Sequence, residues 1–577
     1  MQKLWEYLKP YKKECLIGPF FKLLEAILEL IVPTLMVLII NNGIKNRDTA
    51  YIFKIGGIML FMVVLGFLCS MVCQYNAAKA SQGFGTTLRN AMFRHISSLS
   101  HGELDKLGTS TLINRIINDV NQLQLAVAMA IRLGVRAPFI VLGAIAMAMI
   151  LDFKLALILL AASPVFGIIL YFIINRSSPL YRTYQQRLDK MGLVLKENLS
   201  GVRVIRAFAR RDREEKRFQE ANEDLYSNAV KVGRIASLLN PATSLVMNVA
   251  ILLVLWFGAG HIQNDRLTQG EMIAFVNYIT QIILTLVVIS NQIILYTKAA
   301  ASITRVNEVL NVKPSVVEKS SGTGVPDLRV PAVVFSNVSF AYSKTGDRAL
   351  SNINITIPRG RTVGIIGSTG SGKSTFINLI PRFYDVTEGH IEVDGMNVKD
   401  YSLEALRRKI GLVPQKALLF SGTVAENIRW GRENASEEAI RNAAKVAQAA
   451  EFIEKLPQGY DSTVSRGGVN FSGGQKQRLS IARAIAAQPE ILILDDSASA
   501  LDQATDAALR KAIAEHFTDT TVLIVSQRIS SVRHADSILV FDDGRIVGQG
   551  THDSLLKECE TYREIYHSQT KEEEERA

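Results

Sequence analysis

Cysteine is scarce in this chain of 577 residues, and its few thiols follow no metal-binding or disulfide pattern. The four cysteines are Cys15, Cys69, Cys73 and Cys559. Paired CxxC motifs are lacking, so the spacing predicts no structural zinc site. Cys69 and Cys73 lie one helical turn apart in an apolar run, and we expect them to be packing residues. The opening MQKLWEYLKPYKKE is amphipathic and basic, so we expect no cleavable signal peptide there.

Acidic residues are outnumbered by basic ones, 54 against 65, which gives a net charge of +11. Hydrophobic residues make up 48% of the chain, which excludes a disordered chain, a collagen-like chain and a small disulfide scaffold. The length predicts several domains. The long uncharged runs all lie before about Lys298. The sequence therefore predicts a membrane half followed by a soluble half.

Six segments of the first half are apolar enough to cross a bilayer, which takes about 20 apolar residues in a helix. The four uncharged stretches are Ile55–Cys73, Leu155–Ile174, Ile235–Gly260 and Met272–Thr297. Cys15–Ile40 carries three charges, and Ala137–Leu151 extends back toward Leu125 past two arginines. We expect both to span as well, giving six spans with both chain ends on one side.

The charge of the connections predicts the orientation of these spans. The connection Asn175–Arg234 contains 14 Lys and Arg residues. The opposite connections hold five, namely Lys45, Arg47, Lys54, Lys154 and Arg266. Because basic residues concentrate on the cytoplasmic side, this asymmetry places both termini in the cytoplasm. The net positive charge of the chain is thus explained by the basic cytoplasmic connection, and the sequence does not predict nucleic-acid binding.

The two cytoplasmic connections, about Gln74–Gln124 and Asn175–Arg234, have the composition of helices that run on beyond the bilayer. Their turns are expected near Asp105–Thr111 and Phe208–Glu215. These turns either contact a cytoplasmic domain or are solvated helix ends.

Several polar residues lie inside the expected spans. Glu25 and Glu29 share a helix face. They either form a neutralising group with Lys22 or line a path for cationic or amphipathic substrates. Five amide residues also lie in the spans, namely Asn248, Asn277, Gln281, Asn291 and Gln292. They either line a cavity or form hydrogen bonds between helices.

The soluble half begins with a phosphate-binding pattern. In RTVGIIGSTGSGKST a strand is followed by a glycine loop and a helix start, and Gly367 to Ser374 matches GxxxxGK[ST] at every fixed position. Backbone N–H groups of such a loop surround phosphates at a helix N-terminus. Lys373 is expected to reach the β- and γ-phosphates, and the Ser374 hydroxyl to hold Mg²⁺. The predicted ATP-binding residues of this loop are Gly367, Ser368, Thr369, Gly370, Ser371, Gly372, Lys373, Ser374 and Thr375.

A second pattern, ILILDD, predicts a buried parallel strand that delivers Asp495 to the metal. FSGGQKQRLS precedes it by about 20 residues. With this segment the chain resembles an ATP-binding cassette (ABC) transporter of the exporter half-transporter type, over almost its whole length. The positions that carry the resemblance are Tyr342, Gln415 in GLVPQ, Phe471 to Gln475 in FSGGQ, and Ser499 to Asp502 in SALD.

The resemblance implies roles for these positions. Tyr342 would stack on adenine, and Gln415 would join Ser374 and Asp495 at Mg²⁺. Ser472, Gly473, Gly474 and Gln475 would complete the ATP site of a second subunit, because two cassettes of this family pair head to tail. The implied fold is an all-α transmembrane domain of six helices with long cytoplasmic extensions, followed by an α/β P-loop ATPase domain. The expected boundaries are 1–312 for the membrane domain, 313–330 for a linker, 331–570 for the nucleotide-binding domain and 571–577 for a charged, disordered tail.

Two positions depart from the family's pattern. Asp496 stands where the family has a catalytic glutamate, and Gln527 stands where it has a switch histidine. Asp is shorter by one methylene, about 1.5 Å of reach, and glutamine cannot carry a positive charge. The sequence therefore predicts a degenerate site that binds ATP but hydrolyses it slowly, beside an intact signature motif.

The resulting expectation is one subunit of a heterodimeric multidrug exporter in a bacterial plasma membrane, paired with a homologous but non-identical half-transporter. Hydrophobic, frequently cationic small molecules would be its substrates, ATP and Mg²⁺ its cofactors, and hydrolysis would occur mainly at the partner's site. A peptide or lipid exporter is the nearest variant. The alternative of another class is an ATP-gated regulator or channel without active transport.

Overall fold

The structure is a computed structural model that describes residues 2–263, 266–318, 329–343, 346–497 and 499–574. The chain forms two compact units, one of residues 1–96 and 110–311 and the other of residues 97–109 and 312–577. Most of the expected linker, residues 319–328, and the last three residues of the expected tail lie outside the described residues.

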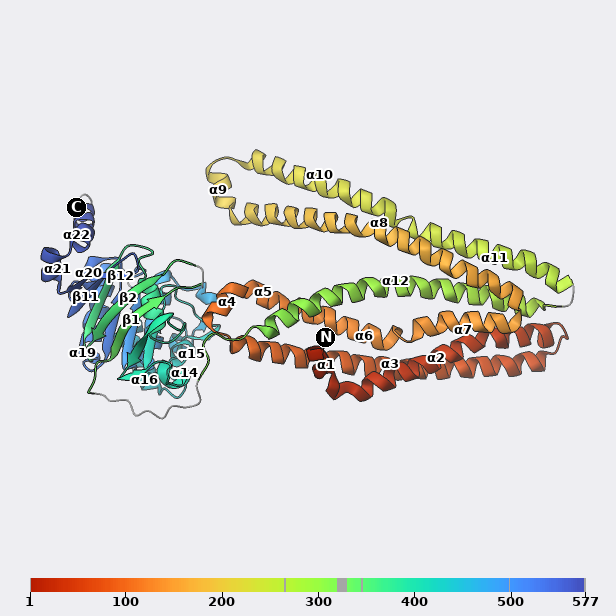
Figure 1. Cartoon of the computed structure of the whole chain (residues 1–577), viewed down its shortest axis with the longest axis horizontal. Coiled ribbons are helices and arrows are strands. Elements are labelled where there is room, and N and C mark those ends of the chain that lie inside the picture. The colour runs from red at the N-terminus through yellow and green to blue at the C-terminus, as the bar shows by residue number, and fades with distance from the viewer. Residues whose placement is uncertain (1, 264–265, 319–328, 344–345, 498, 575–577) are drawn as a thin grey trace. The chain divides into compact units, whose positions relative to one another are not determined.

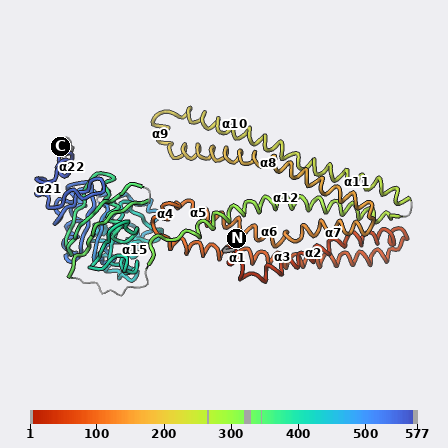
Figure 2. Tube along the Cα trace, viewed as in Figure 1, coloured from red at the N-terminus to blue at the C-terminus, as the bar shows by residue number. Residues whose placement is uncertain are grey.

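The first unit is all-helical (Figure 1). Its helices are α1 (Gln2–Leu8), α2 (Lys12–Leu38), α3 (Thr49–Ser97), α5 (Thr109–Asn114), α6 (Val120–Leu133), α7 (Arg136–Leu151), α8 (Phe153–Ser200), α9 (Val202–Ala207), α10 (Arg211–Ala236), α11 (Leu239–Gln263) and α12 (Gln269–Asn311). Short 3₁₀ or π turns, η1 (Lys9–Tyr11), η2 (Ile39–Ile44) and η3 (Arg115–Asp119), join some of them. Figure 2 shows α8 and α10 running side by side, and the two helices contact each other.

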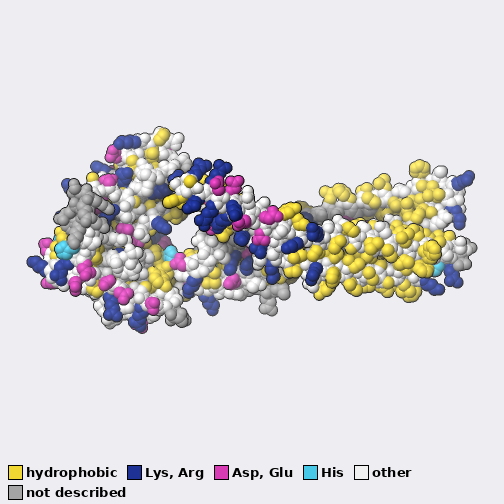
Figure 3. All heavy atoms as spheres, turned by 90° about the horizontal axis from the view of Figure 1, so that it is seen from above, with side chains coloured by type: hydrophobic (Ala, Val, Ile, Leu, Met, Phe, Trp, Pro, Cys, Tyr) yellow, Lys and Arg dark blue, Asp and Glu magenta, His cyan; other side chains and the backbone are white. Residues whose placement is uncertain are grey.

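Six helical segments of the described chain are long and apolar enough to cross a membrane, as the sequence predicted. They are Leu4–Ile44, Thr49–Ser97, Thr109–Leu151, Phe153–Ser200, Arg211–Gln263 and Gln269–Asn311. Each is 41 to 53 residues long, about twice what a bilayer requires. The excess length agrees with the expected extensions beyond the bilayer. Large apolar side chains remain exposed on these helices, Phe61, Phe172 and Trp256 among them, and hydrophobic side chains gather over this unit in Figure 3.

A core of small and aromatic side chains holds the helices together. Ala144 and Ala148 of α7 are fully buried, as are Phe166 of α8 and Phe275 of α12. Small side chains let helix backbones approach closely in an apolar environment. Tyr278 of α12 crosses to α2, where its hydroxyl donates to a backbone carbonyl at 3.0 Å.

The second unit is α/β and confirms the predicted fold class of the soluble half. Its strands are β1 (Val333–Phe340), β2 (Leu350–Ile357), β3 (Thr362–Gly367), β4 (Glu388–Val393), β5 (Met396–Asn397), β6 (Ile410–Val413), β7 (Gly422–Thr423), β8 (Thr463–Val464), β9 (Ile491–Asp495), β10 (Thr521–Val525), β11 (Ser537–Asp542) and β12 (Arg545–Gly550). Its helices are α4 (His101–Leu107), α13 (Lys373–Leu379), α14 (Leu403–Arg408), α15 (Val424–Arg429), α16 (Glu437–Val446), α17 (Ala450–Glu454), α18 (Gly473–Ala486), α19 (Gln503–His516), α20 (Ile529–Val532), α21 (His552–Glu558) and α22 (Glu560–Glu574), with the 3₁₀ turns η4 (Gly459–Asp461) and η5 (Arg466–Gly468).

Two larger sheets organise this unit. One has the strand order β12-β11-β3-β10-β9-β6, in which the five strands from β11 to β6 are parallel. The other is antiparallel, with the order β2-β1-β4-β5. The four-residue run Ile491 to Leu494 in β9 is buried on both faces, as the continuous apolar pattern predicted for a parallel strand.

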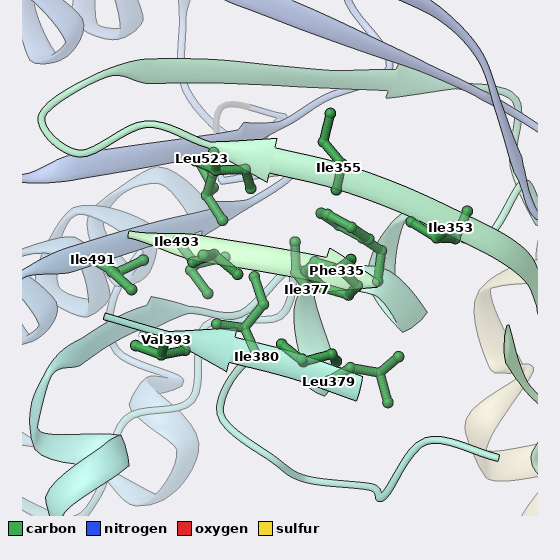
Figure 4. Close-up of a cluster of buried hydrophobic side chains, with 14 of the residues drawn as sticks. Phe335, Ile353, Ile355, Ile377, Leu379, Ile380, Val393, Ile491, Ile493 and Leu523 are labelled. Atoms are coloured by element: carbon green, nitrogen blue, oxygen red, sulfur yellow. The ribbon is translucent and has the colours of Figure 1, made fainter. Parts of the chain in front are cut away.

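Helix α13 is buried in the core that the two sheets share. Its Phe376 stacks on Phe335 of β1 with ring centroids 4.3 Å apart. Figure 4 shows Ile377 of this helix, and Ile380 directly after it, among side chains from β1, β4 and β9. Packing on both sides fixes the position of α13, and therefore of the glycine loop that leads into it.

Candidate nucleotide-binding site

Four loops of the parallel sheet carry the residues that the sequence singled out. The glycine loop follows β3, Gln415 follows β6, Asp495 ends β9 with Asp496 next to it, and Gln527 follows β10. These strands are neighbours in the order β3-β10-β9-β6, so their carboxyl ends lie along one edge. Ligands of open α/β sheets bind at this edge. The fold thus brings together residues that are up to 160 positions apart in the chain (527 − 367).

The glycine loop has the backbone shape that a phosphate cradle requires. Gly367 and Gly372 have φ of 156° and 100°. A Cβ on Gly367 would lie 2.2 Å from the Phe541 carbonyl oxygen, so only glycine fits there. The Lys373 ammonium donates to the Gly367 and Ser368 carbonyl oxygens at 2.8 and 2.6 Å. Burial lowers the pKa of Lys373, although the nearby Asp496 and Asp495 oppose that shift.

The oxygen ligands expected for Mg²⁺ lie side by side. The Ser374 hydroxyl oxygen is 3.4 Å from Oδ1 of Asp495. Burial raises the pKa of Asp495, and the charge of Asp496 adds to the rise. A hydroxyl and a carboxylate are the hard oxygen donors that Mg²⁺ prefers, and the ion takes its other ligands from water and phosphate. Ser374 and Asp495 therefore fit the metal. Gln415 lies one position further along the edge, with its amide nitrogen 3.4 Å from Oδ2 of Asp496.

Asp496 sits in a strained turn after β9. Its φ is 45°, a conformation uncommon for residues other than glycine. Its backbone N–H donates to the Val525 carbonyl at 2.9 Å, and its own carbonyl accepts from the Ser499 hydroxyl at 2.8 Å. Burial raises the pKa of Asp496. The carboxylate is thus held at the sheet edge beside Gln415.

Tyr342 lies two residues after β1, with 51% of its surface exposed. Its hydroxyl is 3.0 Å from that of Thr375 in α13, which ties it to the glycine loop. Its ring meets the Phe340 and Tyr384 rings edge-on, with centroids 4.9 and 5.3 Å away. An exposed aromatic ring anchored beside the phosphate loop can stack on a flat base.

The signature segment starts a different helix. Ser472 caps α18 and Gln475 completes a reciprocal capping box, while Ser472 and Gly473 remain exposed. Helix α18 packs on α15, α16 and β6, whereas α13 packs on β3 and β9. Asp502 of the SALD segment caps α19 through the Thr505 N–H at 2.8 Å. The exposed N-terminus of α18 can serve an anion presented from outside this chain.

The loop of Gln527 is held by a contact that the sequence analysis missed. The side-chain amide of Gln569, in α22, donates to the Gln527 carbonyl at 2.7 Å and accepts from the Ile529 N–H at 2.9 Å. A lone glutamine near the chain end carries no local signal of such a role. Helix α22 continues to Glu574, into the segment expected to be a disordered tail.

Helix α4 also joins this unit, within one of the two expected turn regions. The Tyr384 hydroxyl donates to Oδ2 of Asp105 at 2.8 Å, and the rings of His101 and Phe383 lie 4.3 Å apart. Of the two alternatives for Asp105–Thr111, the contact with the nucleotide-binding unit is therefore the one observed. The other region, Phe208–Glu215, connects α9 to α10 in the helical unit.

Comparisons with known proteins agree with this geometry. Residues 15–286 match the family described as ABC transporter transmembrane region, and residues 350–499 match the one described as ABC transporter. The ABC transporter ATP-binding protein YfiB of Bacillus subtilis is 40% identical, over 99% of this chain and 98% of that protein. YgaD of the same organism, named for multidrug export, is 33% identical over 98% of each chain. The lipid A-core flippase of Haemophilus influenzae is 29% identical, over 98% of this chain and 97% of the flippase. A solved bacterial Atm1-family ABC exporter with ATP bound shares the fold, with a TM-score of 0.75, 24% identity and 98% coverage of each chain.

Proposed function

The chain belongs to the ABC transporter family, and on that premise we propose that it is one subunit of a heterodimeric exporter. In this proposal its own ATP site holds nucleotide but hydrolyses it slowly. The observation that carries the proposal is the pair Asp496 and Gln527, which directly follow the neighbouring strands β9 and β10 at the sheet edge.

The reach of Asp496 argues against fast hydrolysis at this site. An aspartate is about 1.5 Å shorter than the family's glutamate, and displacement of a catalytic group by about 1 Å can cost roughly 100-fold in rate. The strained turn fixes the backbone of Asp496, and Gln415 lies within 3.4 Å of its carboxylate. The residue therefore has little freedom to compensate for its missing methylene.

Gln527 supports the same conclusion independently. Its amide can donate a hydrogen bond to a phosphate, but it cannot supply the positive charge or the proton of a histidine. Nucleotide binding at this site is supported by two contacts, of Ser374 with Asp495 and of Tyr342 with Thr375, and by Lys373 within the glycine loop. Binding without rapid turnover is the combination that this set of residues supports.

The intact signature segment indicates what the chain offers its partner. Ser472 and Gly473 are exposed at the start of α18. In a head-to-tail dimer this helix end would complete the ATP site of the other subunit, where the missing glutamate and histidine are expected. A non-identical partner therefore explains why the signature segment is intact while the catalytic positions, Asp496 and Gln527, are changed.

The names of the relatives support the direction of transport and the substrate class that we propose. One relative is named for multidrug export and another for flipping a lipid, so hydrophobic or amphipathic compounds are the substrate class that we propose. The lipid alternative rests on the second name. We further propose that residues 1–312 form the membrane domain and 331–570 the nucleotide-binding domain, with the latter and both termini in a bacterial cytoplasm.

The asymmetry is tested in the purified complex with its partner by measuring ATP turnover. The double substitution Asp496→Glu with Gln527→His should raise turnover severalfold, because it restores both catalytic groups. Replacing the partner subunit's corresponding glutamate by glutamine should lower turnover about 100-fold.

Asp496→Asn is the matched control and should change turnover less than about twofold. If Asp496→Asn lowered turnover as much as the partner substitution does, the site of this chain would be hydrolytic and the proposal wrong.

A further inference from the structure

A cavity of 590 Å³ lies in the helical unit, among α2, α3, α7 and α12. This volume is within the range of small-molecule sites, about 300–1,000 Å³. Most of its wall is apolar and includes Met36, Met59 and Met62, whose flexible side chains adapt to ligands of different shape. Its polar residues are Glu25, Glu29, Ser70, Arg136, Asn277 and Gln281.

The two glutamates do not form an uncompensated acidic patch. Glu25 accepts from the Lys22 ammonium at 2.6 and 2.8 Å, and Glu29 forms an ion pair with Arg136 at 2.7 Å. The ion pair with Lys22 is thus observed for Glu25, whereas Glu29 pairs with Arg136, and both glutamates also line the cavity. Each negative charge at the cavity has its own positive partner.

Two residues that line the cavity each have one polar atom without a partner among the described residues. Nε of Arg136 and Oε1 of Gln281 are both buried and make no hydrogen bond. One is a donor and the other an acceptor. Both atoms are covered by protein, so they do not meet a ligand in this conformation. The groups that a ligand can meet are the charged ends of Glu29 and Arg136, whose side chains are 37% and 22% exposed.

We propose that this cavity binds amphipathic compounds whose polar group carries a positive and a negative charge together. A simple cation that paired with Glu29 would leave the Arg136 guanidinium without a partner. A simple anion that paired with Arg136 would leave the Glu29 carboxylate without one. A zwitterionic group satisfies both members of the pair, and the largely apolar wall accepts its apolar tail. This inference rests on the proposed function, because it names the substrate class of the exporter.

Three amphiphiles with the same alkyl chain provide the test, namely an alkylphosphocholine, an alkyltrimethylammonium and an alkyl sulfate. Stimulation of ATP turnover is measured with the complex in phospholipid vesicles, below the concentrations at which the amphiphiles form micelles. The phosphocholine should reach half-maximal stimulation at a concentration about tenfold lower than either singly charged compound.

Substitutions of the ion pair should shift the preference in opposite directions. Glu29→Gln leaves Arg136 unpaired and should favour the sulfate, whereas Arg136→Gln should favour the ammonium. Glu14→Gln is the matched control, because Glu14 pairs with Lys79 at 2.7 Å and does not line this cavity. If the single variants fail to fold, the exchanged pair Glu29→Arg with Arg136→Glu keeps both charges and should keep the zwitterionic preference.

The vesicles distinguish a soluble ligand from a membrane lipid. If phosphatidylcholine headgroups themselves fill the cavity, added phosphocholine stimulates in phosphatidylglycerol vesicles but not in phosphatidylcholine ones. If the ligand is a soluble amphiphile, it stimulates in both. Either result supports the zwitterionic class.

A preference of the wild-type complex for the ammonium, an equal response to all three compounds, or equal losses for all three in both charge variants would overturn the inference. The asymmetry of ATP turnover is measured without any amphiphile, so the proposed function stands or fails separately.

Discussion

At the scale of single residues, the site depends on charges placed in partly buried positions. Asp495 and Asp496 follow each other in the chain, and burial raises the pKa of both carboxyl groups. Lys373 lies close to both, and burial shifts its pKa downward. Each group is therefore closer to losing its charge than it would be in water, and a bound ion changes that balance.

The pH dependence of nucleotide binding should reveal the raised pKa of Asp495. Mg²⁺ needs the carboxylate form, so a proton competes with the metal once pH falls toward the raised pKa. We expect the gain in ATP affinity caused by Mg²⁺ to be lost at a higher pH than an ordinary aspartate, near 3.9, would give. Below the raised pKa the loss should approach about tenfold per pH unit. Binding is measured with and without Mg²⁺ across the pH range.

Asp495→Asn provides the comparison for this titration. The variant has no titrating carboxyl group at the position, so its Mg²⁺-dependent gain should be small and independent of pH. A wild-type gain that stayed constant down to about pH 4 would contradict the assignment of Asp495 as the metal ligand.

At the scale of elements, two helices far apart in the chain, α4 and α22, contact residues beside the nucleotide site. Asp105 of α4 contacts Tyr384, and the Tyr384 ring packs edge-on against Tyr342, the residue expected to stack on adenine. Tyr384 therefore links α4 to the expected adenine site. Helix α22 holds the Gln527 loop through Gln569. Burial raises the pKa of Tyr384, and its bond to Asp105 adds to the rise, so the phenol remains a donor at neutral pH.

The bond between Tyr384 and Asp105 should contribute to coupling between ATP turnover and transport. Tyr384→Phe and Asp105→Asn should each lower the amount of substrate moved per ATP hydrolysed by about two- to fivefold, as expected for one hydrogen bond of about 1 kcal/mol. Both efflux and ATP turnover are measured in the same vesicles.

The double variant makes this prediction specific. Since either single change already breaks the bond, combining them should cost little more than one alone. Additive losses would show that the two residues act independently, and unchanged coupling in both single variants would show that the contact is not used.

At the scale of the whole molecule, the chain combines six long apolar helices with a soluble ATP-binding unit. Apolar side chains stay exposed on the helices because a bilayer, not water, is their surroundings. The excess of Lys and Arg in the connection 175–234 therefore predicts that this connection lies on the cytoplasmic side of the membrane.

Labelling of intact bacterial cells checks that orientation. In a variant whose four cysteines are replaced by alanine, Asn46→Cys should react with a membrane-impermeant maleimide, because residue 46 is expected outside. Arg213→Cys should react only after the cells are opened. Both positions are exposed in the structure, so burial does not explain a failure to react. The reverse pattern would invert the topology.

Features that depend on neighbours in the chain were accessible from the sequence. The six spans follow from local hydropathy, and the glycine loop of Gly367 to Ser374 follows from backbone geometry that few other residues permit. The resemblance of the later motifs pointed to Asp496 and Gln527 at the sheet edge, and the parallel strand order places them there.

Contacts between distant segments depended on packing. Glu29 forms an ion pair with Arg136, 107 positions away in the chain, and Asp105 is hydrogen-bonded to Tyr384, 279 positions away. No local pattern encodes such pairs, because they exist only once helices and sheets have buried their apolar faces and brought the remaining polar groups within reach. The sequence therefore showed Lys22 as a possible partner for the glutamates of α2, but only the tertiary structure showed that Glu29 pairs with Arg136.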